Sequence, residues 1–195
     1  AGSVEWVGYL STTGVYGNRD GDWVDEASDL RPSSPRSERR VRAERAWLEW
    51  GDRTGISVQI FRLAGIYGPG RSVADQIKAG TARRIAKPGH LFSRIHVEDI
   101  ATVVSASMAR PRAGGIYNVC DDEPAVPGDV VTYACSLLEI EPPPEIPVED
   151  ADLSPIAKSF WLDNRRVSND LIKLELGVEL AFPDYRTGIR TILGG

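Results

Sequence analysis

Short apolar runs alternate with amphipathic stretches along the chain. Residues 4–10 and 57–63 are largely apolar, favour strands, and run into loops that contain glycine. Between them, residues 37–50 place Val41, Trp47 and Trp50 at helical spacing, with arginines on the opposite face. The order of strand, helix and strand predicts a parallel βαβ unit.

The pattern further along the chain predicts more helices than strands. A strand is expected over residues 115–119, and helices over residues 72–79, 97–109, 127–140, 168–176 and 185–193. Residues 18–35 are rich in Gly, Asp, Ser and Pro, and residues 83–88 are basic, so both are expected to be loops. Consecutive prolines keep residues 141–147 extended, either as a surface connection or as a small interaction segment.

Composition narrows the class of protein. With 42% hydrophobic and 26% charged residues, the 195-residue chain is an ordinary globular protein of one domain or slightly more. Its 23 basic and 28 acidic residues give a net charge of −5, which argues against a nucleic-acid binder. The apolar runs are far shorter than the roughly 18 residues of a membrane span, and no signal-peptide pattern opens the chain. We therefore expect no membrane contact and a cytoplasmic location.

Cysteine and histidine usage predicts no metal site. The chain has two cysteines and two histidines, and none of them lies in a metal-ligand spacing such as Cys-x-x-Cys. We expect Cys120 and Cys135 to be small apolar residues of the core.

Five motifs occur in a fixed order along the chain. They are STTGVYG at residues 11–17, RLAGIYGPG at 62–70, IHVEDIA at 95–101, GIYNV at 115–119, and LG followed by P-x-Y-x-x-G-I within residues 176–189. In this order they resemble the extended short-chain dehydrogenase/reductases, the NAD-dependent epimerase/dehydratase family. The resemblance implies an α/β fold, a doubly wound parallel Rossmann sheet with a small α/β substrate-binding subdomain.

The resemblance also suggests how the chain is divided. Residues 1–63 correspond to later strands and a helix of the Rossmann-like domain, and residues 64–195 mainly to the substrate-binding subdomain, interleaved with the sheet near residues 115–119. Family members begin with a strand and a Gly-x-x-Gly-x-x-Gly turn that holds the pyrophosphate, and no such turn occurs here. We therefore expect only the C-terminal part of the sheet, without the cofactor half. Such a sheet has an open edge, so we expect that the polypeptide either includes further residues or pairs with another molecule through that edge.

The family's catalytic pair is replaced in this chain. Counting back from Glu44, the family's Tyr-x-x-x-Lys falls on Arg36 and Arg40, while Thr12 matches the Ser/Thr position. In the family the tyrosine exchanges a proton with the substrate and hydride moves to or from the nicotinamide. Arginine cannot replace that tyrosine, because its pKa stays above about 12. Arg40 could still donate hydrogen bonds to a ribose or a phosphate.

The resemblance assigns further residues to the ligands. Arg40, Leu63, Ala64 and Gly65 correspond to cofactor-binding positions, with NAD or NADP as the implied cofactor. The other assigned residues lie at implied substrate-binding positions, and they are Thr13, Arg71 and Arg94. The substrate is expected to be a nucleotide-sugar or another small polar molecule, and the helix of residues 37–50 is a candidate homodimer contact.

Other polar residues have structural interpretations. Tyr16 is expected to pack and hydrogen-bond in its loop, and His96 to cap a helix. Asp99 is expected to interact with a helix dipole, and Asn118 to bond backbone at a strand end. Three hypotheses follow: an atypical NAD(P)-dependent epimerase/dehydratase-like oxidoreductase, a non-catalytic dinucleotide- or ligand-binding regulatory protein, or a structural partner subunit.

Overall fold

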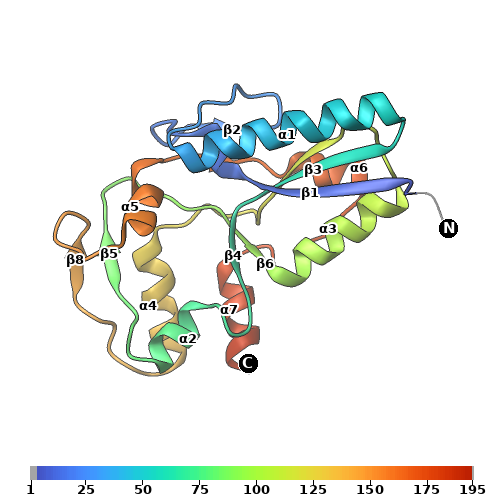
Figure 1. Cartoon of the computed structure of the whole chain (residues 1–195). Helices are drawn as coiled ribbons and strands as arrows, with labels where there is room; N and C mark the ends of the chain where they lie inside the picture. The colour runs from blue at the N-terminus through green and yellow to red at the C-terminus, as the bar shows by residue number, and fades with distance from the viewer. Residues whose placement is uncertain (1–3, 195) are drawn as a thin grey trace.

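A three-stranded parallel sheet forms the centre of the fold (Figure 1), in a computed structural model that describes residues 4–194. Its strands are β1 (Trp6–Thr12), β3 (Ser57–Leu63) and β7 (Ile116–Val119), in the order β1-β3-β7. Leu63 lies opposite Thr12 on one side and Val119 on the other. Because all three strands run in the same direction, their carboxyl ends meet at one edge of the sheet.

The α/β class with a parallel sheet is confirmed. The predicted βαβ unit is present, since β1 and β3 pair in parallel on either side of one helix. The narrower expectation, that the chain forms only the C-terminal part of such a sheet, is not supported by the sheet itself, which has its own first strand from Trp6.

Helix α1 (Pro35–Thr54) covers one face of the sheet (Figure 1). The Ser34 side chain accepts a hydrogen bond from the Ser37 amide, and Pro35 occupies the first turn, so the start of the helix is well capped. Gly55 ends the helix in the left-handed conformation, at φ 71°. These caps make the helix longer at both ends than the predicted residues 37–50.

Two helices cover the opposite face. They are α3 (Val97–Ala109) and α6 (Asp170–Leu176). Side chains of β3 and β7, such as Phe61 and Tyr117, pack there against Val103 of α3 and Ile172 of α6. This cluster forms the largest part of the hydrophobic core and fixes the direction in which the strands end.

A second group of elements lies beyond the carboxyl edge of the sheet (Figure 1), and we call it the helical lobe. It contains α2 (Val73–Lys78), β5 (Arg84–Ala86), α4 (Pro127–Leu137), β8 (Glu145–Pro147), α5 (Pro155–Leu162) and α7 (Tyr185–Leu193). Helices α2, α4 and α7 share one apolar cluster, while β5 and α5 share another. Between the lobe segments the chain returns to the sheet, first through α3 and β7 and later through α6.

Short strand pairs connect the lobe with the sheet. Strand β4 (Gly65–Tyr67) pairs with β6 (Arg94–His96), and β2 (Trp23–Val24) pairs with β9 (Arg166–Val167), both in parallel. A 3₁₀ helix, η1 (Thr13–Tyr16), follows β1 directly.

Several predicted segments differ from the structure. Residues 83–88, expected to be a loop, contain β5, which pairs with β8 in the extended proline segment. Helix α4 ends at Leu137 and does not reach residue 140. Helix α5 was not predicted at all, and neither was the two-residue strand β2 within the loop of residues 18–35. None of the helices within residues 4–194 combines the length and the apolar character that a membrane crossing requires.

Candidate functional site

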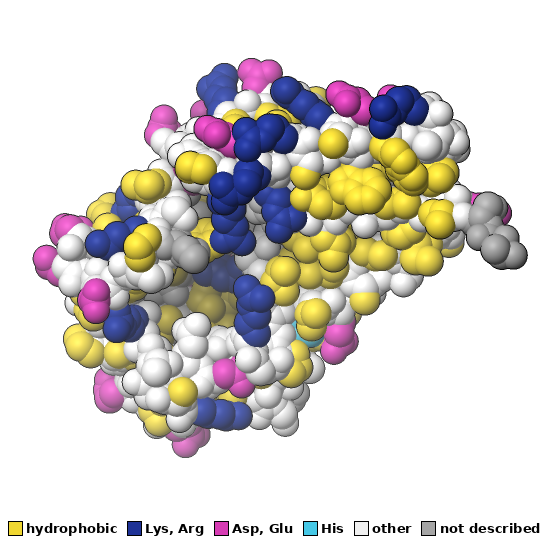
Figure 2. Space-filling model, viewed as in Figure 1, with side chains coloured by type: hydrophobic (Ala, Val, Ile, Leu, Met, Phe, Trp, Pro, Cys, Tyr) yellow, Lys and Arg dark blue, Asp and Glu magenta, His cyan; other side chains and the backbone are white. Residues whose placement is uncertain are grey.

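A cavity of about 1130 Å³ opens between the carboxyl edge of the sheet, the start of α1 and the helical lobe. Figure 2 shows the hollow on one face of the molecule, with Lys and Arg side chains gathered along its walls. Every residue predicted for catalysis, cofactor binding or substrate binding lines this cavity, namely Thr12, Thr13, Arg36, Arg40, Leu63, Ala64, Gly65, Arg71 and Arg94. The fold therefore brings residues from distant motifs to one place, although their individual roles stay predictions.

The end of β1 supplies hydroxyl groups to the cavity. Thr12 caps η1, and its Oγ1 accepts a hydrogen bond from the Gly14 amide at 3.1 Å. The hydroxyl hydrogen of Thr12 therefore remains available for a ligand. Thr13 is 6% exposed and also lines the cavity.

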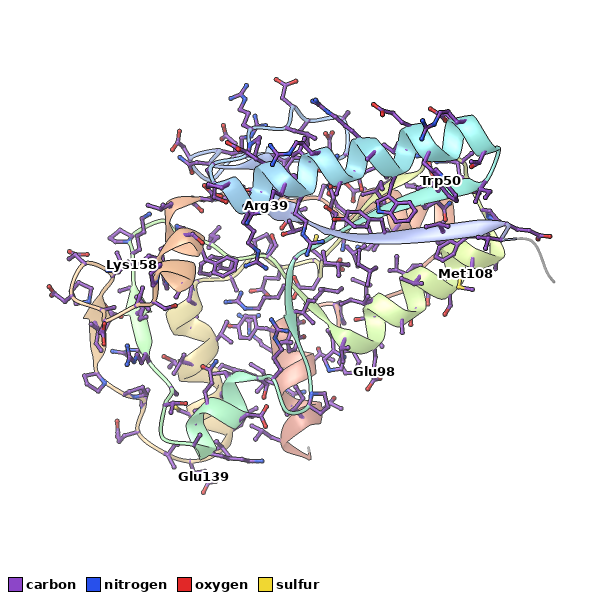
Figure 3. All side chains as sticks on the ribbon, in the orientation of Figure 1. Arg39, Trp50, Glu98, Met108, Glu139 and Lys158 are labelled. Atoms are coloured by element: carbon purple, nitrogen blue, oxygen red, sulfur yellow. The ribbon has the colours of Figure 1, made fainter. Side chains whose placement is uncertain are left out.

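The first turns of α1 supply two guanidinium groups. Arg36 and Arg40 are four residues apart and so lie on the same face of the helix. Nη1 of Arg40 donates to Tyr9 Oη and to the Leu10 carbonyl, both at 3.0 Å. Figure 3 shows this end of α1, marked by Arg39, and the nearby helix α5, marked by Lys158. Both helices contribute residues to the cavity wall.

A buried ion pair holds α1 against the sheet. Arg62 of β3 donates to Glu44 of α1 at 2.8 Å, and both side chains are 3% exposed. Ser11 of β1 donates to the same carboxylate at 2.5 Å. These bonds connect α1, β1 and β3 behind the cavity, and so they fix the start of α1 relative to the end of β1.

Tyr16 belongs to the same hydrogen-bond network. Its hydroxyl accepts from Arg62 Nη1 at 2.9 Å and donates to Asn118 Oδ1 at 2.7 Å. Burial raises the pKa of Tyr16 to about 12, which makes it a poor proton donor or acceptor near neutral pH. Asn118 was expected to bond backbone through its side chain, but its Oδ1 accepts from this tyrosine. The Asn118 backbone amide instead donates to Glu26 Oε1 at 2.7 Å.

Arg94 enters the cavity from the lobe side with fixed orientation. Its Nη1 donates to the carbonyls of Phe92 at 2.8 Å and Ala125 at 3.3 Å. Burial lowers its pKa, an effect that the nearby Asp121 partly offsets. Burial in turn raises the pKa of Asp121 to about 8. Asp121 was not singled out as a site residue from the sequence, although it lies two residues after the end of β7, at the carboxyl edge where functional side chains collect.

The charge of the cavity wall is strongly positive. Two acidic residues line the cavity, and both have partners: Asp75 accepts from Ser72 in a capping box, and Asp163 pairs with Arg165 at 3.3 Å. Six arginines also line the cavity, and they are Arg36, Arg40, Arg71, Arg83, Arg94 and Arg165. Sequence analysis missed Arg83 and Arg165, because no motif contains them. In a chain of net charge −5, this arrangement suits an anionic ligand.

Two residues near the sheet edge have structural roles. His96 caps α3 as expected, since its Nδ1 accepts from the Glu98 amide at 3.3 Å. Asp99, expected to act through the helix dipole, also accepts hydrogen bonds from the amides of Ala181 at 2.8 Å and Phe182 at 3.0 Å. It thereby holds the segment that leads into α7. Within the described residues, no group of three or more His, Cys, Asp or Glu side chains could hold a metal ion.

The groups that line the cavity suit hydrogen bonding to a ligand better than proton transfer. Arg36 and Arg40 stand where an acid–base tyrosine and its lysine would be expected from the motif register. The tyrosines that line the cavity are Tyr67 and Tyr185, and burial raises the pKa of each. Apart from the nearby Asp121, which does not line the cavity, the arrangement thus offers hydrogen-bond donors and positive charge rather than an acid–base group suited to neutral pH.

Comparison with known proteins gives the chain its relatives. The sequence profile described as NAD dependent epimerase/dehydratase family matches residues 3–120. Protein YeeZ of Escherichia coli K12 is 33% identical over 178 residues, which cover 90% of this chain and 58% of YeeZ. The chain thus spans less than two thirds of the length of that curated relative.

Solved structures agree with the sequence match. A conserved protein of unknown function from Silicibacter pomeroyi is 53% identical, with a TM-score of 0.90, over 96% of this chain and 66% of its own. The dTDP-glucose 4,6-dehydratase of Bacillus anthracis, solved in complex with NAD, is 19% identical with a TM-score of 0.78, over 95% of this chain and 60% of its own. That second similarity shows the fold alone. On the profile match, the chain belongs to the NAD dependent epimerase/dehydratase family.

Proposed function

We propose that this chain forms the substrate side of an atypical NAD(P)-dependent epimerase/dehydratase-like oxidoreductase that acts on a nucleotide-linked or small polar, anionic substrate. The observation that carries the proposal is the cavity wall, where six arginines face two aspartates that already have partners. In the same proposal, residues 1–63 form later strands and a helix of the Rossmann-like domain, and residues 64–195 form mainly the substrate-binding subdomain.

Phosphate groups suit the arginines of the lobe side. A guanidinium group binds a phosphate through several donors in a fixed plane, and such bonds are stronger inside a cavity than in water. Arg94 is already oriented by two backbone carbonyls, so it loses little freedom when a ligand binds. Arg71 also lines the cavity, and because its side chain is exposed it can reorient toward a bound ligand.

The residues present fit one end of a dinucleotide cofactor. Thr12, Arg40 and the turn of Leu63, Ala64 and Gly65 line the cavity where β1 and β3 end, and Arg40 keeps its Nε and Nη2 donors for a ribose or phosphate. No glycine-rich turn for a pyrophosphate occurs in the sequence. When bound, a nicotinamide would supply hydride transfer. The role proposed for these side chains is to orient its ribose and the substrate.

A regulatory, non-catalytic function is the alternative, and Arg36 and Arg40 favour it. If the protein only binds a dinucleotide or another ligand, replacement of the family's tyrosine and lysine by arginines does not impair its function. The double substitution Arg36→Tyr with Arg40→Lys tests this alternative on the full-length protein. Turnover that appears only in the double variant supports a binding function, whereas turnover in the wild type supports the oxidoreductase.

Nucleotide binding tests the main proposal. We expect isothermal titration calorimetry to show binding of UDP or dTDP, and Arg71→Gln to weaken it about tenfold or more, as for loss of a hydrogen bond to a charged group. Arg94→Gln should have a similar effect, with thermal melting to verify its fold. Arg39→Gln is the matched control, because Arg39 is exposed on α1 and does not line the cavity. Absence of binding at millimolar concentration, or an equal loss in Arg39→Gln, contradicts the proposal.

We also propose a homodimer through α1. Trp47 and Trp50 pack edge to face at 5.6 Å, and Trp47 remains 36% exposed. Figure 2 shows hydrophobic side chains gathered near α1 and β1. Sedimentation of the wild type and of Trp47→Glu tests this contact, since a monomer in both contradicts it.

A further inference from the structure

We propose that the end of the cavity formed by Arg36, Arg40 and Thr13 is a second oxyanion subsite, which holds a carboxylate or phosphate group of the ligand. It would lie where the motif register places the family's tyrosine and lysine. The inference rests on the proposed function to the extent that both subsites belong to one cavity. It concerns the reacting end of the ligand, whereas Arg71 and Arg94 concern its phosphates.

The charges of Arg36 and Arg40 lack acidic partners. Within residues 4–194, Arg36 makes neither an ion pair nor a hydrogen bond, and Arg40 uses only Nη1, toward the uncharged Tyr9 and Leu10. Glu38 lies on the same turn of α1, but it is exposed and does not line the cavity. Two guanidinium groups one helical turn apart therefore face the cavity without a counterion.

Thr13 adds an independent observation. The residue is 6% exposed, it lines the cavity, and its hydroxyl makes no hydrogen bond with any described residue. Because Thr13 lines the cavity, this hydroxyl can donate a hydrogen bond to a ligand oxygen there. Thr12 lies next to it; its Oγ1 accepts a hydrogen bond from the Gly14 amide, and its hydroxyl hydrogen is free to donate. Thr12, Thr13, Arg36 and Arg40 can thus each donate a hydrogen bond at this end of the cavity.

A cluster of donors selects an acceptor. Carboxylate and phosphate oxygens only accept hydrogen bonds when ionised, and their charge would compensate the two arginines. A neutral sugar hydroxyl would leave both charges without a counterion. The N-terminus of the 20-residue helix α1 points its positive dipole toward the same space, which favours an anion further.

Buried contacts hold in place the backbone that carries this subsite. The buried pair of Arg62 and Glu44, together with Ser11, fixes α1 to the ends of β1 and β3. The backbone positions of Arg36, Arg40 and Thr13 are therefore fixed relative to one another, and preorganisation of this kind favours affinity. The substrate class that fits both subsites is a nucleotide-linked sugar that carries an acidic group on the sugar.

Two nucleotide sugars that differ in one carboxylate provide the test. Calorimetric titration of the wild type is expected to show UDP-glucuronate binding about tenfold or more tighter than UDP-glucose, as for charge-assisted hydrogen bonds. In the double variant Arg36→Gln with Arg40→Gln, this ratio should fall to about one, because the charge-assisted bonds to the carboxylate are lost. Thr13→Val should lower the ratio by a smaller factor. The exposed Arg39→Gln should leave it unchanged.

Small anions distinguish this subsite from the proposed function. Oxalate and inorganic phosphate are titrated alone, with the wild type and the double variant. Binding of either anion that depends on Arg36 and Arg40 supports the subsite, even if neither nucleotide sugar binds and the proposed function fails. Preference for phosphate over oxalate assigns a phosphate group. The inference is overturned if the wild type binds the two nucleotide sugars with equal affinity. It is also overturned if the double variant lowers the affinity for UDP-glucuronate and for UDP-glucose by the same factor.

Discussion

Replacement of His90 by phenylalanine should make the protein less sensitive to acid. The His90 ring is 1% exposed, stacks on Trp161 with centroids 5.1 Å apart, and meets Phe92 edge-on at 4.7 Å. This aromatic group joins α5 to the rest of the helical lobe. Burial, with the nearby charge of Lys87, lowers the pKa of His90 from 6.5 to about 4. Phenylalanine keeps the ring and its packing but cannot take up a proton.

The sign and size of the effect follow from the two pKa values. Above pH 6.5 the imidazole is neutral in both the folded and the unfolded chain, so it does not affect the pH dependence of stability. As pH falls, the unfolded chain takes up the proton first, and stability is lost until pH reaches the folded pKa of about 4. The full loss is about 3 kcal/mol, at about 1.4 kcal/mol per pKa unit, and roughly 2 kcal/mol of it is reached by about pH 5.

Urea unfolding, followed by tryptophan fluorescence and circular dichroism, measures this loss. The free energy of unfolding is compared between about pH 7.5 and about pH 5 for the wild type and His90→Phe. Other groups, such as Asp121, titrate in both proteins and cancel in the difference. The wild type should lose about 2 kcal/mol more than the variant. If the two proteins lose the same stability within about 0.5 kcal/mol, the buried ring accepts its charge and the reasoning fails.

Three further outcomes test the packing. Gly188→Ala should lower the free energy of unfolding by about 1–3 kcal/mol, because its Cβ would lie 2.2 Å from Tyr67 Oη. Gly128→Ala should be tolerated, because its Cβ would lie 3.3 Å from a flexible arginine side chain; equal unfolding midpoints of the Gly188→Ala and Gly128→Ala variants would contradict this difference. Glu44→Gln should cost about 3–5 kcal/mol in urea unfolding, because it leaves Arg62 buried without its counterion; a loss below about 1 kcal/mol would show that water reaches the pair. Both cysteines are buried and their pKa values raised, so a thiol reagent such as DTNB should label neither until the protein unfolds; rapid labelling of the native protein would show that the core opens.

Elements with strong local signals were predicted well. Strand β3, helix α3 and helix α7 have the bounds expected from hydrophobic periodicity and glycine signals. The lobe was predicted less well, because its short elements depend on distant partners. Strand β5 exists only because it pairs with β8, about 60 residues later in the chain. Helix α5 lies between a loop and a strand, and its eight residues are too short a stretch to show a helical period.

The candidate site shows the same division. Motif order was sufficient to name residues that share one cavity, because motifs at the carboxyl ends of parallel strands converge by topology. Arg83 and Arg165 belong to no motif and reach the cavity only through the packing of the lobe. The partners of Asn118 and Asp99 were likewise unpredictable from local sequence, since they lie about 100 and 80 residues away along the chain.

The discontinuity of the helical lobe limits how the protein can evolve. Its helices come from three separate stretches, which include residues 73–78, 127–162 and 185–193, and α2, α4 and α7 bury one another in a single cluster. Removal of any one stretch from the gene would leave the other two without their apolar partners. The lobe therefore cannot be lost or exchanged as a block. New ligand preferences must arise by point substitution in the cavity wall or by insertion in its loops, while the sheet keeps its sequence.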